Sequence, residues 1–356
     1  MSSLADTLDV MRPLLPPALV GADAFERART AVEHLRPEIT DGIHFECRLH
    51  ERSNRVDLVI IVRREGAALL AAPLTRTLPG VRSEDPAWRR LSAFCREWTA
   101  SRSRLQELIE HIWLEYDVAA GGGLSRPAPG VFCRLRRPHR AAQTARELCR
   151  RTLTVVEALT GHPASHIVRE CLCAMLRLST DAAIPYVGFM LGRALPTIRI
   201  CIAKLPAADA ENYLDATAAV SSRVAARITC QAALPDGAGG PWYVPMLHLD
   251  IDERRGFLPR IGMERPFPQL CQLAGTTGAA ERKLLDVLTM QDLCTRRKRD
   301  ALLAWPGSSV AMMRHHLGWS TVERRINHIK FVHEPGLGTE AKAYLFARYY
   351  RRGDRR

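Results

Sequence analysis

Short segments in which every second residue is apolar recur in pairs along this chain, and helical stretches separate the pairs. In residues 42–50, Ile43, Phe45 and Cys47 would share one face of a strand. We expect five hairpins, at 42–50 with 55–63, 111–118 with 130–136, 186–192 with 196–203, 243–252 with 258–265, and 325–333 with 340–350. Helical segments are expected between all of them, which indicates one supersecondary unit repeated five times.

Ten antiparallel strands in one open sheet would leave two exposed edges, and closure into a barrel removes them. Helices packed outside each hairpin would cover the apolar face, so the polar face would line a lumen. In the first strand that face carries His44, Glu46, Arg48 and His50. The alternative is an ordinary half-exposed sheet, whose polar face meets bulk water.

We therefore predict an α+β fold, a ten-stranded antiparallel β-barrel built from five αββα units, with helices outside and the ligand site in the lumen. Residues 1–356 would form one domain, with amino-terminal helices in 1–38 packed on the barrel.

Charge and composition limit the classes of molecule that this protein is expected to bind. The formal net charge is +13, and only five of the 51 basic residues are lysines, which favours anionic partners such as phosphates or acidic peptides. No apolar run approaches the length of a membrane span, and the amino-terminal residues lack a signal pattern, so we expect a cytoplasmic protein without a membrane partner. No specific nucleic-acid partner is expected, because the chain lacks helix-turn-helix, zinc-finger and RNP-type motifs. Ten cysteines without a CxxC pair indicate reduced thiols and no metal site.

Three stretches carry a resemblance to a known family. They are HFECRLHERSNRVDLVIIV (44–62), PYVGFMLGRALPTIRICI (185–202), and the closing pair INHIKFVHEP and EAKAYLF. Together with their order and the repeated αββα unit, they resemble the ABBA, or PT-barrel, prenyltransferases, and look closest to the peptide prenyltransferases of cyanobactin pathways. The resemblance implies that an allylic diphosphate, dimethylallyl or geranyl, ionises inside the barrel and that a peptide or aromatic acceptor captures the carbocation. It implies no tightly bound cofactor, although the peptide-modifying members tend to use Mg²⁺ with the diphosphate.

The resemblance also assigns roles to residues of the polar face. Glu46 is the candidate base that orients the acceptor and takes its proton. Basic and hydroxyl groups would bind the diphosphate and stabilise the leaving group; the candidates are Arg134, Arg199, Lys330, Lys342, Tyr344 and Arg348. Other polar and aromatic residues would line the acceptor side of the lumen, namely His44, Trp113, Glu115, His248 and His328.

Two functions fit this pattern. The first is prenyl transfer to a peptide side chain or small aromatic acceptor, in the biosynthesis of a ribosomally made, modified peptide or a similar natural product. The second is a non-catalytic barrel that binds a peptide or anionic ligand for partner enzymes. The low aromatic content, 6%, favours the second, because a lumen that shields an allylic cation needs aromatic rings.

Overall fold

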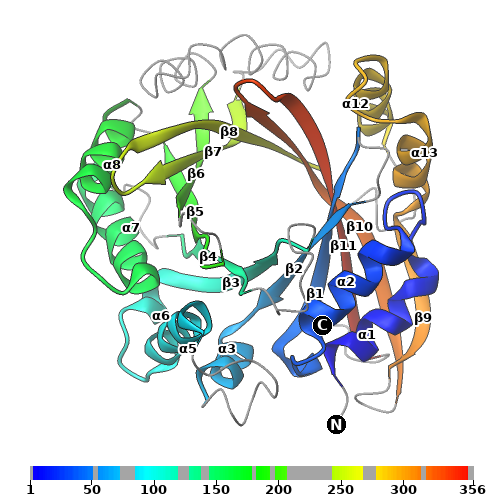
Figure 1. The fold of residues 1–356 in the computed structure, drawn as a ribbon, viewed down its shortest axis with the longest axis horizontal. Coiled ribbons are helices and arrows are strands. Elements are labelled where there is room, and N and C mark those ends of the chain that lie inside the picture. The colour runs from blue at the N-terminus through cyan, green and yellow to red at the C-terminus, as the bar shows by residue number, and fades with distance from the viewer. Residues whose placement is uncertain are drawn as a thin grey trace.

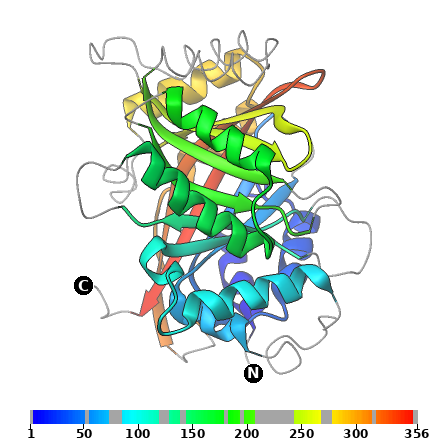
Figure 2. The same ribbon diagram turned by 90° about the vertical axis from the view of Figure 1, so that its left-hand side faces the viewer.

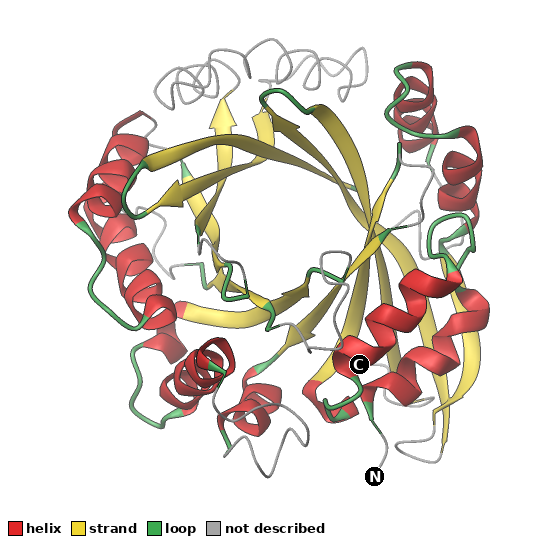
Figure 3. Ribbon diagram, in the orientation of Figure 1, coloured by secondary structure: helices red, strands yellow, loops and turns green. Residues whose placement is uncertain are grey.

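The sheet closes on itself into a ring with helices around it. The computed structural model describes residues 3–50, 55–72, 85–118, 128–137, 144–178, 182–192, 197–206, 243–267, 278–313 and 318–351. Viewed along the axis of the ring, the strands form a closed circle and the helices lie outside it (Figure 1, Figure 3). The inner side of this circle is called the lumen below. The predicted helical segment 207–228 falls outside the described residues.

Eleven strands form one antiparallel sheet. They are β1 (Thr40–Arg48), β2 (Val56–Val62), β3 (Ile109–Tyr116), β4 (Gly130–Leu135), β5 (Ala183–Phe189), β6 (Ile198–Pro206), β7 (Tyr243–Asp252), β8 (Gly256–Pro266), β9 (Gly307–Met313), β10 (Gly318–Glu334) and β11 (Gly338–Arg351). Ten of them follow one another around the ring, which β1 closes by pairing with β11. The predicted ten-stranded antiparallel barrel with helices outside is confirmed.

One strand was not predicted. β9 lies at the edge of the sheet, outside the ring, and pairs with the first half of β10 from Gly318 to Arg324. β10 therefore begins before the predicted start at residue 325. Only residues in its second half, His328–His333, pair with β8 in the wall of the barrel. Residues 307–313 lack the strict alternation that identifies a half-buried strand, so the pattern gave no signal there.

The helices begin and end at local signals of the sequence. They are α1 (Leu4–Met11), α2 (Ala22–Val32), α3 (Arg64–Ala71), α5 (Pro86–Thr99), α6 (Leu105–Leu108), α7 (Ala145–Thr160), α8 (His166–Leu178), α12 (Ala279–Met290) and α13 (Arg296–Ala304), with single 3-10 turns at Arg12–Leu14 and Pro37–Ile39. Asp85 caps α5, because its carboxylate accepts hydrogen bonds from the backbone amides of Ala87 and Trp88. Thr144 caps α7, because its hydroxyl oxygen accepts a hydrogen bond from the backbone amide of Glu147. α7 ends at Gly161, whose φ of 84° is the left-handed conformation that favours glycine.

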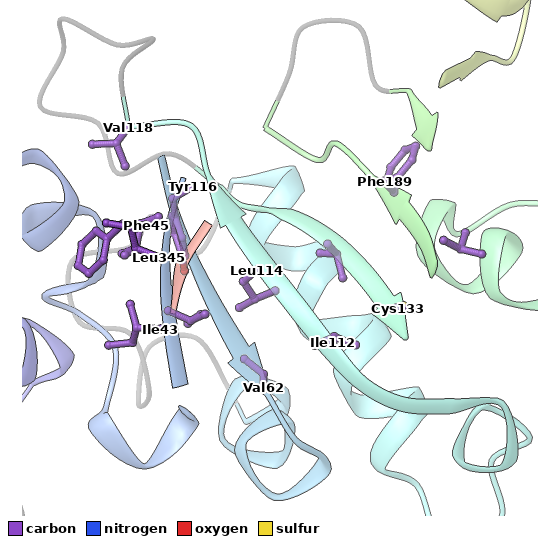
Figure 4. Packing of buried hydrophobic residues seen from close by; sticks show 14 of the residues in the cluster. Ile43, Phe45, Val62, Ile112, Leu114, Tyr116, Val118, Cys133, Phe189 and Leu345 are labelled. Carbon is purple, nitrogen blue, oxygen red and sulfur yellow. The ribbon is translucent and has the colours of Figure 1, made fainter. Parts of the chain in front are cut away.

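The hydrophobic core is the layer between the barrel and its helices. Alternate residues of β1, Ile43, Phe45 and Cys47, are fully buried there, and Leu345 of the neighbouring β11 packs beside them (Figure 4). The helices pack along the outer side of the strands in the perpendicular view as well (Figure 2). Because side chains alternate across a strand, burying these residues outside turns the intervening polar residues into the lumen.

Candidate functional site in the lumen

The inward face of β1 and β11 is organised around Glu46. The ammonium of Lys342 lies 2.7 Å from Oε1 of Glu46, and the hydroxyl of Tyr344 donates to Oε2. Glu46 and Lys342 are 3% and 5% exposed. Burial alone would raise the pKa of Glu46, but Lys342, Lys330 and the Tyr344 hydroxyl lower it well below its usual range. Glu46 is therefore a firmly held carboxylate and a weak base at neutral pH.

The ion pairs continue from Lys342 toward the hairpin turns. Lys342 also lies 3.1 Å from Oε1 of Glu340, and Arg48 lies 3.1 Å from Asp57 and 3.7 Å from Glu340. Asp57 is 3% exposed. Burial, and then the nearby charge of Glu46, raise the pKa of Asp57 to about 7, against the opposing effect of Arg48.

On the opposite side of the ring, Arg199 of β6 and Asp250 of β7 form a buried two-pronged pair. The distances from Nε to Oδ1 and from Nη2 to Oδ2 are 2.6 and 2.9 Å, and Arg260 lies 3.5 Å from the same carboxylate. Although burial opposes ionisation, the Arg199 guanidinium holds the pKa of Asp250 below its usual range. The charge of Arg199, predicted to bind a phosphate, is thus largely balanced within the protein.

Lys330 differs from these cations. It is 5% exposed, and within the described residues its ammonium makes no hydrogen bond and no ion pair. The ammonium lies over the ring of Tyr344, 5.9 Å from the ring centroid. Burial lowers the pKa of Lys330, and Arg199 adds to that effect, while Glu264, Glu46 and Glu115 oppose it. A small recess beside it is lined by Arg199, His248, Asp250, Arg260, Gly262, Lys330 and Val332.

Aromatic rings gather next to this recess. The ring of His44 lies edge-on to Trp113 and to Phe346, at centroid distances of 4.8 and 4.7 Å. Trp113 in turn contacts Tyr186 at 5.4 Å, and the Arg134 guanidinium lies 4.7 Å above the Tyr186 ring. These contacts form an aromatic belt on four strands of the barrel, made of His44, Trp113, Tyr186, Tyr344 and Phe346.

Two histidines share one carboxylate in the lumen. Nε2 of His248 lies 2.8 Å and Nε2 of His328 lies 3.4 Å from Oε1 of Glu264. His328 also stacks on Tyr344, with 3.9 Å between ring centroids. Burial lowers the pKa of His248 to about 4 and also lowers that of His328, so both imidazoles are neutral at pH 7.

Most of the predicted site residues therefore come together, and one does not. Arg348 is exposed near the end of β11, opposite Gly42 and Glu323, and lies apart from the recess. Glu115 is partly exposed, and burial followed by the charge of Glu46 raises its pKa.

Four lumen residues were missed by the sequence analysis, namely Asp57, Cys201, Arg260 and Glu264. Each has the alternate spacing of a predicted inward face, so the period-two pattern contained the signal. What the pattern could not supply was the partner of each residue across the barrel.

Neither a metal site nor a membrane span emerges from the described residues. No group of three or more histidine, cysteine, aspartate or glutamate side chains among them could hold a metal ion. No helix in the described ranges is long and apolar enough to cross a membrane.

A ring of ten antiparallel strands with helices outside and a polar face inside is the PT-barrel, the fold of the ABBA prenyltransferases. Among solved structures, the chain is similar to the apo form of the prenyltransferase PriB, with a TM-score of 0.52, 16% identity, and coverage of 97% of this chain and 94% of that chain. It is also similar to 5-dimethylallyltryptophan synthase from Streptomyces coelicolor, with a TM-score of 0.47, 14% identity and 97% coverage of each chain.

A scan of protein-family models and a search of curated proteins each found no match. At 16% identity, the structural likeness to PriB shows a shared fold and nothing more. The predicted link to the cyanobactin enzymes stays a prediction.

The Glu46–Lys342 pair predicts strong coupling in stability. Lys342→Met leaves a buried carboxylate without its main cation, and we expect a loss of about 3–5 kcal/mol in the free energy of unfolding. The double variant Glu46→Gln/Lys342→Met should recover much of that loss, because it removes both charges. Urea unfolding of the wild type, both single variants and the double variant measures the coupling. Additive effects would contradict the pairing.

The raised pKa of Asp57 predicts a pH-dependent cost. Below about pH 4 the carboxyl is protonated in the folded and unfolded chain, so it adds no difference. Between about pH 4 and pH 7 the carboxyl of Asp57 is ionised in the unfolded chain but still protonated in the folded chain. The free energy of unfolding therefore falls as the pH rises through this range. Asp57→Asn should therefore become more stable relative to the wild type as pH rises, by up to about 4 kcal/mol at pH 8. Unfolding curves from pH 4 to 8 test this, with exposed Asp300→Asn as control; parallel profiles for wild type and Asp57→Asn would refute it.

Proposed function

We propose that this protein is a prenyltransferase that moves an allylic isoprenoid from its diphosphate to a peptide side chain or small aromatic acceptor. The donor would be dimethylallyl or geranyl diphosphate, and residues 1–356 would act as one cytoplasmic barrel domain. The natural setting would be the biosynthesis of a modified peptide or related natural product. The fold, the cationic recess and the adjoining aromatic belt support this proposal.

The observation that carries the proposal is the buried Lys330 ammonium. A buried lysine that makes no direct ion pair is costly even with the carboxylates of Glu264, Glu46 and Glu115 nearby, and an anionic ligand would offset part of that cost. Arg260 lines the same recess and has a loose contact of 3.5 Å with Asp250, whereas Arg199 forms a close hydrogen-bonded pair with Asp250. In this structure the recess is too narrow to hold a phosphate, so a diphosphate would reach Lys330 and Arg260 only after the lining side chains move apart. As the C–O bond of the donor ionises, these cations stabilise the charge on the leaving group.

The aromatic belt would shield the allylic cation. The ring of Tyr344 lies 5.9 Å from the Lys330 ammonium, and Trp113 and Tyr186 contact each other edge to face in the same lumen. The quadrupoles of such rings attract a cation. The belt also contains His44, whose pKa is lowered well below its usual value by burial, so it stays neutral and does not repel the carbocation.

The structure favours Glu115 over Glu46 as the base. A general base works best with a pKa near the working pH. The pKa of Glu46 lies below its usual range because Lys342 and Tyr344 hold it, whereas burial raises the pKa of Glu115. In this assignment Glu46 positions Lys342 and Tyr344, and Glu115 takes the proton of the acceptor.

A non-catalytic anion-binding barrel is the second candidate. It is favoured by the buried pairs Arg199–Asp250 and Lys342–Glu46, which neutralise two of the predicted phosphate-binding cations. Incubation with dimethylallyl and geranyl diphosphate, with and without Mg²⁺ and with aromatic and peptide acceptors, separates the two. Release of inorganic diphosphate supports the enzyme, and stabilisation by a donor without release supports the binding protein.

Lys330→Met should weaken binding of dimethylallyl diphosphate at least about tenfold, because a charge-assisted contact contributes about 1.5–3 kcal/mol. Titration calorimetry measures the affinity. Lys330→Arg should retain most of it, and Lys283→Met, at an exposed position on α12, is the matched control. Unchanged affinity in Lys330→Met would remove the recess as the diphosphate site.

Glu115→Gln should lower kcat by about 10²–10⁴-fold with little change in donor affinity, as expected for loss of a general base. Glu46→Gln should instead change donor affinity or stability, because it releases Lys342 and Tyr344. Single-turnover rates and donor binding in both variants test the division of roles. A larger loss of rate in Glu46→Gln, with a stable fold and normal donor binding, would reverse the assignment.

A further inference from the structure

The lumen contains a thiol with a base beside it. Cys201 of β6 lies opposite His248 of β7, and Sγ is 3.4 Å from Nδ1 of the imidazole. On the other side of that ring, Nε2 lies 2.8 Å from Oε1 of Glu264 on β8, a close charge contact that is not aligned as a hydrogen bond. Three neighbouring strands thus place a thiol, an imidazole and a carboxylate in a row.

The order of atoms in this row suits a nucleophile. For the thiol to donate to Nδ1, the neutral imidazole must carry its proton on Nε2, and a carboxylate close to Nε2 favours that tautomer. A nucleophile, a base and a group that orients the base is the arrangement by which thiols and hydroxyls are activated in enzymes.

Gly262 makes the arrangement possible. It lies opposite His248 in the sheet, and a Cβ at this position would come within 3.0 Å of the His248 Cβ and 3.3 Å of the Lys330 Cε. A side chain there would push the imidazole and the lysine apart. The row of three is therefore packed directly against the cationic recess.

Cys201 differs from the other buried thiols. Cys47, Cys95 and Cys133 belong to the apolar core between barrel and helices, while Cys201 lies on the inward face with Arg199. The charged and titratable groups around it are Arg199 on its own strand, Asp250 and His248 on β7, Glu264 on β8, Lys330 on β10 and Tyr186 on β5. Burial raises the pKa of Cys201 and lowers that of His248, so the pair rests as thiol and neutral imidazole.

We propose that Cys201 is a nucleophilic thiol, with His248 as its proton acceptor and Glu264 as the positioning residue, and that it captures an allylic group when no acceptor occupies the lumen. In this step the C–O bond of the allylic diphosphate breaks and a C–S bond forms at Cys201. The thiol proton passes to His248, and inorganic diphosphate leaves with the electron pair of the C–O bond. The nucleophile stands on the geometry alone, whereas the allylic electrophile rests on the function proposed above.

The first experiment tests the nucleophile without any isoprenoid. The folded protein is treated with iodoacetamide, and the alkylation rate of each cysteine is followed by peptide mass spectrometry. We expect Cys201 to react at least about tenfold faster than Cys133, and His248→Gln to remove at least about tenfold of that rate. Cys201→Ser is the control for assignment. Equal rates for Cys201 and Cys133 in the wild type overturn the proposal, and this comparison does not depend on whether a variant folds.

The second experiment adds dimethylallyl diphosphate without an acceptor. We expect one dimethylallyl group on the Cys201 peptide and one equivalent of released diphosphate. Fast alkylation without a dimethylallyl adduct or any diphosphate release supports the nucleophile and counts against the proposed donor. Normal transfer to an added acceptor without any Cys201 adduct overturns the capture step and leaves the proposed function intact.

Discussion

The structure depends on how a closed sheet accommodates charges on its inner face. Ionised groups that leave water must be paired, or they destabilise the fold by several kcal/mol each. The inner face meets this demand across neighbouring strands, with Arg199 against Asp250 and Lys342 against Glu46. The strand register therefore also decides which charged side chains become partners. A slip of one residue would move each of these groups to the other face of the sheet, among apolar side chains.

This compensation makes the exceptions informative. Two lumen cations, Arg199 and Lys342, are balanced by carboxylates, whereas Lys330 makes no direct ion pair within the described residues and lies beside the recess. The same reasoning separates the carboxylates, because Glu46 is held by two donors while burial raises the pKa of Glu115. Roles in the lumen thus follow from the partner of each group more than from its chemical type.

Very different sequences can adopt the PT-barrel fold, because the likeness to PriB extends over nearly the whole chain at only 16% identity. The inner face holds the titratable groups of this chain, including Cys201, His248 and Glu264, which lie in a row that Gly262 leaves room for. Function on a shared fold is decided at that level, by side chains that a common backbone brings together.

The sequence by itself determined the ten barrel strands, the helices outside and the inward direction of Glu46, Lys330 and Lys342, because alternation and turn signals are local properties of the chain. It did not determine β9, whose pairing with an extended β10 lacks a strict alternating pattern. Nor could it show that Lys342 is tied to Glu46 across nearly 300 positions while Lys330 is not. The Glu46–Lys342 pair depends on ring closure between β1 and β11. Only the tertiary structure decides this closure, because side chains from the two ends of the chain become neighbours only when the sheet closes.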